Sequence, residues 1–336
     1  MSDGYRVEPF SSTDAEGVAA LFGEVYGDSY PIKVVYDPAS LVAISQEGRY
    51  FPFVVRHPSR GVIAYGALVQ SAPYRGIYEF VQGIVSPGFQ GAGLGRMLFE
   101  WVERYLPTLP GAEAYFGEAV CNHAHTQKAG ALIKTVETGI EVDLMSGEPY
   151  AKGVAASGRV SVVDQFRTFV SRPQTVYVPG VYEDICRTIY GGLDDPRTIS
   201  LSTGGPDPDL STQMSAQTFE HVGAVRVAVS LAGADFADRF DREERSLVQG
   251  GIKGVQVWLR LSQPWVGEIA GMLRRRGYFL GGVLPRWFDD DGLLMQRTID
   301  RPNWDGIHLY TQRAQRMLEF IHEDWSTVQG LTESRE

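Results

Sequence analysis

Residues 85–98 read VSPGFQGAGLGRML, and small residues gather at one point of this stretch. An apolar strand is predicted before it, and an amphipathic helix is predicted to begin within it. Small side chains leave the backbone N–H groups at a helix start uncovered, and these donors favour an anion together with the positive end of the helix dipole. Glycine also lets a ligand approach the backbone closely. The stretch therefore predicts a phosphate-binding loop.

Two common phosphate-binding motifs do not fit this loop. A Walker loop ends in Gly-Lys-Ser/Thr, whereas this chain has Gly95-Arg96-Met97. A dinucleotide fingerprint needs a third glycine where Arg96 stands, and it normally follows the first strand of a domain. What remains is a Q-x-x-G-x-G run from Gln90 to Gly95, placed between a predicted strand and a predicted helix.

This run, with the Ser-Pro turn before it, resembles the loop of the GNAT family (GCN5-related N-acetyltransferases), which binds the pyrophosphate of acetyl-CoA. The resemblance implies an α/β protein with a mixed sheet, the GNAT acyl-CoA N-acyltransferase fold, and acetyl-CoA as co-substrate. It also implies contacts from the end of the preceding strand and from an asparagine after the fifth strand. The cofactor-binding residues expected on this basis are Gly83, Ile84, Val85, Gln90, Gly91, Ala92, Gly93, Leu94, Gly95, Arg96 and Asn122.

Acetyl transfer to an amine needs a neutral amine, a polarised carbonyl and a proton for the leaving thiolate, and positioning supplies much of the rate. Glu79 lies eleven residues before Gln90 on the predicted strand. In histone-type members of the family a catalytic glutamate occupies a similar place, so the resemblance implies that Glu79 is the base. A carboxylate on a largely apolar strand can have a raised pKa. The alternative is a solvated strand residue or a partner of Arg75.

The proton donor is harder to predict. Many family members have a tyrosine about seven residues after the asparagine position, but this chain has Ala129 and Gly130 there and no tyrosine between Cys121 and Met145. His123 is the candidate that we take for this role, with His125 and Thr126 as alternatives. A histidine at a helix start is also often a capping or surface residue.

Other chemically capable residues favour structural roles. Cys121 ends a strand and is expected in the core rather than as a nucleophile. The acidic run 289–292 lacks the spaced ligands of a calcium site and indicates a hairpin turn. No metal site is predicted, because the chain has two cysteines, far apart. An acceptor pocket could be lined by aromatic residues, most of which will be core, and the candidates are Tyr74, Tyr78, Trp287 and Trp304.

Hydrophobic periodicity and a run of turn-forming residues predict two units, over 1–150 and 158–336, joined by a linker over 146–158. The resemblance implies that the first unit is the acetyl-CoA-binding domain. In the first unit we expect strands over 5–10, 50–56, 62–69, 77–85, 112–120 and 138–145, and helices from Ser12, over 37–47, from 94 to before Pro107, and over 124–133. In the second we expect strands over 159–166, 175–178, 224–231 and 255–261, and helices over 182–190, 235–248 and 265–276.

Residues 277–297 resemble the closing segment of a GNAT domain: the end of a helix, a strand, a hairpin turn and a last strand. This resemblance implies a degenerate GNAT-like second domain, and an unrelated α+β domain is the alternative. The second half contains no Q-x-x-G-x-G run, so we expect no second acetyl-CoA site.

Composition limits the partners, the location and the classes of function that remain. The net charge is −10 and the only basic run is Arg274–Arg276, which argues against nucleic acid as the main partner. No apolar segment is long enough for a bilayer and no leader of the standard type is seen, so a cytoplasmic protein without membrane association is expected. We expect an N-acetyltransferase acting on a small-molecule or peptide amine, and a homodimer is left open. The alternatives are a non-catalytic acyl-CoA sensor and an enzyme acting on protein lysines.

Overall fold

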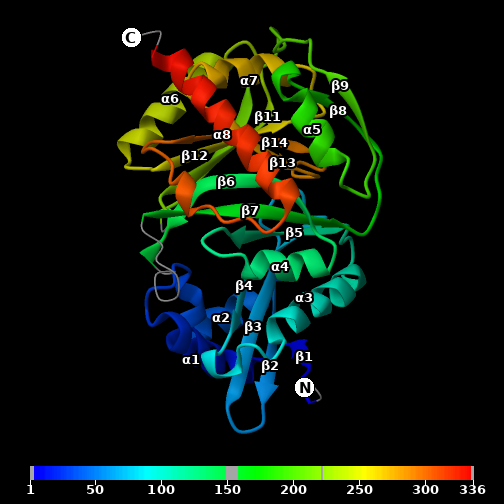
Figure 1. The fold of residues 1–336 in the computed structure, drawn as a ribbon, viewed down its shortest axis with the longest axis vertical. Coiled ribbons are helices and arrows are strands. Elements are labelled where there is room, and N and C mark those ends of the chain that lie inside the picture. The colour runs from blue at the N-terminus through cyan, green and yellow to red at the C-terminus, as the bar shows by residue number, and fades with distance from the viewer. Residues whose placement is uncertain (1–3, 149–157, 221, 334–336) are drawn as a thin grey trace.

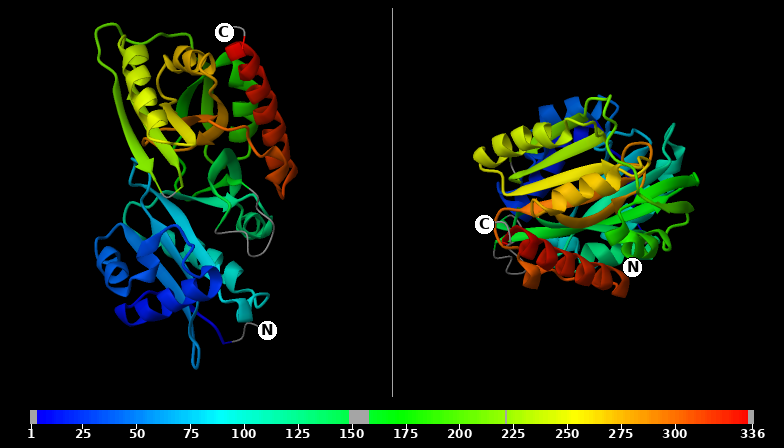
Figure 2. Two further views of the ribbon diagram at one scale, coloured as in Figure 1. Left: turned by 90° about the vertical axis from the view of Figure 1, so that its left-hand side faces the viewer. Right: turned by 90° about the horizontal axis from the view of Figure 1, so that it is seen from above.

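The computed structural model describes residues 4–148, 158–220 and 222–333. One mixed sheet of twelve strands runs through these residues, in the order β1-β2-β3-β4-β5-β7-β6-β13-β14-β12-β11-β10, and β8 and β9 form a separate parallel pair. The molecule has two lobes, and the first lobe is built from the N-terminal third of the chain (Figures 1 and 2). The mixed α/β class predicted from the sequence is confirmed.

The first half of the chain contains seven strands and four α-helices among its described residues. The strands are β1 (Val7–Pro9), β2 (Tyr50–His57), β3 (Gly61–Val69), β4 (Ile77–Val85), β5 (Ala114–Val120), β6 (Val136–Ser146) and β7 (Arg159–Thr168). The helices are α1 (Ala15–Tyr26), α2 (Pro38–Ser45), α3 (Leu94–Tyr105) and α4 (His125–Leu132).

The second half contains the remaining elements. Its strands are β8 (Gln174–Val178), β9 (Arg197–Leu201), β10 (Gln213–Phe219), β11 (Ala224–Leu231), β12 (Gly254–Arg260), β13 (Phe279–Leu284) and β14 (Gly292–Thr298). Its helices are α5 (Glu183–Tyr190), α6 (Phe236–Gln249), α7 (Val266–Arg274) and α8 (Gln312–Glu333). None of the helices in the described ranges is long and apolar enough to cross a membrane.

Alternating side chains explain how the helices cover the first part of the sheet. Phe53 and Val55 of β2 pack with Leu98 and Val102 of α3 on one face. Val54, between them, packs on the other face with the apolar side chains of α1 and α2. Successive strand residues point to opposite faces, so a strand buried on both sides is apolar at nearly every position.

The helix starts follow local hydrogen bonding. Asp37 caps α2, because its carboxylate accepts from the backbone N–H of Ala39 and Pro38 begins the helix. The expected start at Ser12 is displaced: Ser11 and Asp14 form a capping box around a single 3₁₀ turn, and α1 begins at Ala15.

The strand predicted over 159–166 to open the second unit is β7, which lies within the first half of the sheet. β7 is antiparallel to β5 on one side and to β6 on the other. The predicted linker falls largely on residues 149–157, outside the described residues. The chain thus closes the first part of the sheet with β7 before it enters the second part.

The second part of the sheet repeats the strand order of the first. In β3-β4-β5-β7-β6 the successive pairs are antiparallel, parallel, antiparallel and antiparallel. The same sequence of directions holds for β10-β11-β12-β14-β13. A helix joins the parallel strands in both cases, α3 in the first and α6 in the second.

β9, β10 and α8 are not among the predicted elements, although Ala314, Met317, Ile321 and Val328 recur at helical spacing and are buried.

The two parts of the sheet join at a pair of glycines. β6 and β13 meet where Gly139 faces Gly282. A Cβ atom on Gly282 would overlap the backbone of Gly139 and the carbonyl oxygen of Thr138, and the φ of Gly282 is +140°. Only a residue without a side chain permits this approach. α8 packs over the joint against β13 and β6 (Figure 1).

Gly282→Ala is therefore expected to destabilise the protein by about 3 kcal/mol or more, since the new methyl group meets backbone and a left-handed φ. Urea unfolding followed by tryptophan fluorescence measures this change. Gly254→Ala is the matched control, because Gly254 also lies in a strand of the second half but a Cβ there meets nothing within 4 Å. Equal stability losses in the two variants would contradict this account of the joint.

Candidate active site

A cavity of about 980 Å³ opens where β4 and β5 separate. The two strands are paired in parallel only from Ile77/Ala114 to Glu79/Phe116. Beyond this point β4 stays paired with β3, and β5 stays paired with β7. The edges of β4 and β5 that face each other are no longer hydrogen-bonded to one another. Residues 79–85 and 117–120 both line the cavity. The unpaired edge of β4 can therefore hydrogen-bond an extended ligand in the manner of a third strand.

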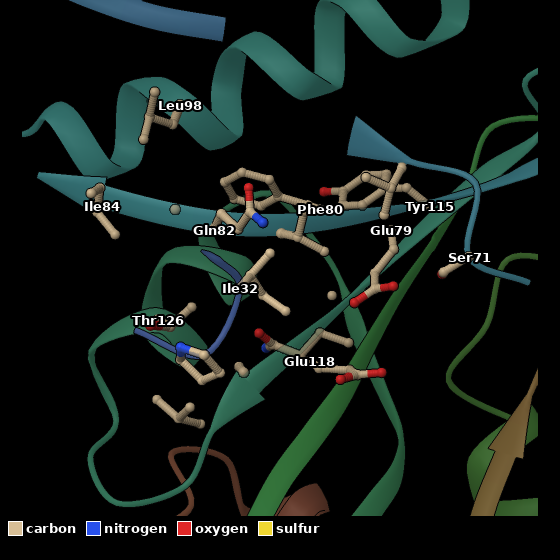
Figure 3. A pocket seen from close by; sticks show the side chains of 18 of the residues that line it. Ile32, Ser71, Glu79, Phe80, Gln82, Ile84, Leu98, Tyr115, Glu118 and Thr126 are labelled. Carbon is tan, nitrogen blue, oxygen red and sulfur yellow. The ribbon is translucent and has the colours of Figure 1, made fainter. Parts of the chain in front are cut away.

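A bulge sharpens the separation of the strands. The register of β4 on β3 shifts between the pairs Val81/Ala67 and Ile84/Tyr65, and Gln82 has a φ of +60°. A bulge bends its strand and increases the local twist. The Tyr50 hydroxyl donates to the side-chain oxygen of Gln82, and Figure 3 shows the Gln82 side chain at the cavity. The predicted cofactor-contacting residues Gly83, in the bulge, and Ile84 and Val85, after it, all line the cavity.

The predicted phosphate loop has the geometry of an anion site. Gly91 and Gly93 have φ values of +83° and +82°, and Gly93 is the N-cap of α3. No side chain caps this helix among the described residues. Cβ atoms added at Gly91, Gly93 or Gly95 would meet nothing within 4 Å, so the space in front of the helix start is open. The start of α3 thus has no side-chain cap, and the space beside the loop glycines is open.

The loop and the cavity meet at the start of α3. Gly95 and Arg96 belong to the cavity lining, whereas the other expected loop residues, Gln90, Gly91, Ala92, Gly93 and Leu94, lie beyond its end. Arg96 is exposed and pairs with Glu100 on the next helical turn. A ligand that places an anionic group at the loop can accordingly extend through the cavity along β4.

Glu79 also lines the cavity, and it is the last residue of β4 that pairs with β5. Its side chain is 9% exposed. Figure 3 shows its carboxylate directed toward Glu118 of β5, with Ser71 beside it. Burial and the neighbouring Glu118 charge raise the pKa of Glu79 to about 8, although Arg226 and a hydrogen bond from Ser71 act in the other direction. The raised pKa expected for a base on this strand is thus present.

A network of charges surrounds Glu118. The Arg226 guanidinium from β11 donates through Nη2 to Glu118 at 2.5 Å and to Glu141 of β6 at 3.2 Å. Its Nε donates to the side-chain oxygen of Gln256 at 2.8 Å, and Gln256 in turn donates to Glu141. Burial is the main cause that raises the pKa of Glu141, to about 7.

Asp164 of β7 completes this cluster. Its carboxylate is 1% exposed, and neither oxygen has a hydrogen-bond partner. Oxygens of Asp164, Glu118 and Glu141 lie within 4.8 Å of one another. Burial, followed by repulsion from Glu141 and Glu118, raises the pKa of Asp164 well above its usual value. Sequence reasoning missed this network, because its residues come from β5, β6, β7, β11 and β12 and have no common motif.

The residues after β5 divide between the cavity and the core. His123, His125, Thr126 and Ala129 line the cavity. Nδ1 of His123 accepts from the backbone N–H of His125, so the ring proton of a neutral His123 is on Nε2. Partial burial and the adjacent His125 lower the pKa of His123. Asn122 is buried outside the cavity lining, and its side-chain oxygen has no hydrogen-bond partner.

Several other candidates are structural. Cys121 is fully buried and burial raises the pKa of its thiol, as expected for a core residue. Tyr74, Tyr78, Trp287 and Trp304 lie outside the cavity lining, whose tyrosines are instead Tyr26, Tyr30, Tyr50 and Tyr115.

The acidic run after β13 forms a turn, as predicted, and each of its carboxylates pairs with an arginine. The partners are Arg172 for Asp289, Arg260 for Asp290 and Arg197 for Asp291.

Comparisons with known proteins find similarity among solved structures. No protein-family model matches the chain, and no curated protein matches it. The spermidine/spermine N-acetyltransferase of Vibrio cholerae, solved in mutant forms, is 15% identical over 49% of this chain and 94% of its own, with a TM-score of 0.38. The ribosomal-protein-S18-alanine N-acetyltransferase of Escherichia coli is 16% identical over 50% and 96%, also with a TM-score of 0.38. A protein from Desulfovibrio desulfuricans assigned to the GNAT family of acetyltransferases is 17% identical over 49% and 99%, again at 0.38.

Proposed function

We propose that this protein is a GNAT-type N-acetyltransferase that transfers the acetyl group of acetyl-CoA to a primary amine by direct attack. One observation carries the proposal. The cavity between β4 and β5 is lined both by Gly95 and Arg96, at the open N-terminus of α3, and by the buried side chain of Glu79. It therefore links an anion site to a candidate base along an unpaired strand edge.

Each part of the cavity has a role in this proposal. The N–H groups of Gly91 and of Gly93 to Arg96 would hold the pyrophosphate, because those of Gln90 and Ala92 already donate to the carbonyls of Pro87 and Phe89. The free edge of β4 over 83–85 would hydrogen-bond the pantetheine arm and hold the thioester carbonyl, and acetyl-CoA would supply the activated acetyl group. Bound in this way, the thioester would lie between the loop and Glu79.

Glu79 would accept the proton of the attacking amine, directly or through a water molecule. The new C–N bond forms as the C–S bond breaks, and CoA leaves as the thiolate. At pH 7 a carboxyl with a pKa of about 8 is mostly protonated, so the ionised fraction and hence the rate are expected to rise up to about pH 8.

The proton donor to the thiolate differs from the usual tyrosine of the family. Ala129 stands at the cavity where that tyrosine would be expected. His123 lines the same region and carries its proton on Nε2, and its lowered pKa keeps it mostly neutral at pH 7. We propose that His123 stabilises the leaving sulfur by a hydrogen bond rather than by full proton transfer. The acceptor is a small-molecule or peptide amine.

The alternative function is an acyl-CoA sensor that binds without transfer, and Ala129 at the tyrosine position favours it. The test incubates the protein with acetyl-CoA and a panel of diamines, amino acids and peptides. Free thiol is measured with a disulfide reagent and the N-acetyl product by mass spectrometry. Amine-dependent thiol release supports the enzyme. Calorimetric binding of acetyl-CoA without thiol release supports the sensor, and absence of binding contradicts both.

A further inference from the structure

Arg226 is a residue of the second half that lines the cavity of the first half. It lies on β11, more than one hundred residues after Glu118 in the chain. Its Nη2 contacts Glu118 and Glu141, its Nε contacts Gln256, and its guanidinium lies 5.3 Å from the ring centre of Phe219 and 5.8 Å from that of Trp287. Contacts on so many sides hold the guanidinium in one place beside Glu118, which lines the cavity, and Glu141.

Because the strand order repeats, Arg226 can be matched to a residue in the first part of the sheet. Glu79 faces Phe116 of β5, which in turn faces Phe166 of β7. In the second part of the sheet, Arg226 faces Gln256 of β12, which in turn faces Gln296 of β14. The two halves can be aligned on Gly139 and Gly282, which face Asp164 of β7 and Leu294 of β14. Counted from these two glycines, the strand pairs have the same register in both halves. Arg226 thus occupies in the second half the ladder position of Glu79 in the first.

The strands of the second half that correspond to β4 and β5 do not separate within the described residues. β11 and β12 stay paired from Ala224/Gly254 to Val229/Leu259, whereas β4 and β5 separate after three pairs. The position equivalent to the candidate base therefore carries a cation and faces the cavity of the other half. This arrangement gives the second half a role in the first half's site.

The charges around Glu79 come from four other strands of the sheet. Glu118 of β5, Glu141 of β6 and Asp164 of β7 are acidic, and Arg226 of β11 is the cation among them. Ser71, before β4, contributes a hydroxyl. Without Arg226, Glu79 would have to ionise within a group of carboxyls that share a buried region, which repulsion and poor solvation oppose.

We propose that Arg226 is a positioning residue of the acetyl-transfer site: it holds Glu118 beside Glu79 and supplies the positive charge that lets Glu79 act as a base, so that the second half completes the first half's acceptor site. This inference rests on the proposed role of Glu79. Its structural basis is the bond from Arg226 to Glu118 and the matched ladder positions of Arg226 and Glu79.

The experiment titrates the carboxyl of Glu79 directly, so that it does not depend on turnover. Protein labelled with ¹³C at glutamate carboxyls is followed by NMR from pH 5 to pH 9, and Glu79→Gln assigns the resonance. In Arg226→Met the loss of the positive charge should move the Glu79 midpoint upward by about one pH unit or more. Arg226→Lys keeps the charge and should stay within about half a unit of wild type.

Activity supplies a second measurement. A shift of one unit lowers kcat/KM of Arg226→Met at pH 7 about tenfold, because the ionised fraction of Glu79 falls tenfold. Acetyl-CoA affinity should remain within about twofold, since Arg226 is remote from the glycine loop. Arg274→Met is the matched control: it breaks the buried ion pair with Asp324 in the same half without touching the cavity.

The outcomes separate this inference from the proposed function. An unchanged Glu79 midpoint in Arg226→Met, or an equal shift in Arg274→Met, overturns the role of Arg226. Should Arg226→Met fail to fold, Glu118→Gln decides: removing the acidic neighbour should lower the Glu79 midpoint, and an unchanged midpoint overturns the proposed coupling. Absence of acetyl transfer with every amine would overturn the enzyme, while the NMR titration would still test Arg226.

Discussion

Replacing Glu79 with Gln is expected to lower kcat at pH 8 by about 100-fold or more, which is the usual contribution of a general base. The amide keeps the size of the side chain but cannot accept a proton from the amine. Acetyl-CoA should bind with nearly unchanged affinity, because Glu79 lies at one end of the cavity-lining segment 79–85 and the glycine loop follows the other end. Thiol release under steady-state conditions and calorimetric titration measure the two quantities.

The direction in which the rate changes with pH is a further test of Glu79 as the base. Burial and Glu118 raise the pKa of Glu79 to about 8, so the wild-type kcat/KM should increase with pH and level off above that value. The residual activity of Glu79→Gln should lack this increase with pH. Glu137→Gln is the control, since Glu137 is also a buried glutamate, hydrogen-bonded to Thr311 and outside the cavity lining. If Glu137→Gln also loses the increase with pH, this would contradict the assignment of that increase to the carboxyl of Glu79.

Placing carboxylates in the glycine loop is expected to abolish acetyl-CoA binding. In the double variant Gly93→Asp, Gly95→Asp, two negative charges stand where the pyrophosphate would lie. At about 4 Å each pair of like charges near a protein surface costs about 4 kcal/mol, so the loss of affinity should exceed 100-fold. Calorimetric titration with acetyl-CoA measures it.

The single variant Gly95→Asp separates repulsion from backbone strain. Gly93 has a φ of +82°, so any side chain there is strained, whereas Gly95 lies in the first turn of α3 with open space around it. Gly180→Asp is the matched control, because Gly180 is exposed, meets nothing within 4 Å and lies in the second half. Unaltered binding in Gly95→Asp would show that the loop is only a turn.

The parts of the site that are local in sequence could be predicted. The spacing of glycines from Gly91 to Gly95 needs only the strand and helix on either side, and both were found at their predicted residues. Glu79 was found because it lies on the same strand that leads into the loop. In each case the residues that act together are within about fifteen positions, so the periodicity of one strand or helix is enough to place them.

The acceptor side could not be predicted in this way. The four aromatic candidates are distributed among other clusters, and the tyrosines that line the cavity come from α1, the segment after it, β2 and β5. The pairing of β7 with β5 and β6 could not be predicted either, because strand order in a sheet is set by contacts between residues distant in sequence.

The sequence by itself determined the mixed α/β class, most of the strands, the glycine loop and the candidate base, because these depend on contacts between near neighbours along the chain. The tertiary structure alone decided that Arg226 faces Glu118, that Asp164 and Glu141 lie behind them, and that Gly139 meets Gly282. These contacts join residues up to about 140 positions apart across a curved sheet of twelve strands. Their geometry follows from strand order and register, and neither is visible in the spacing of residues along one strand.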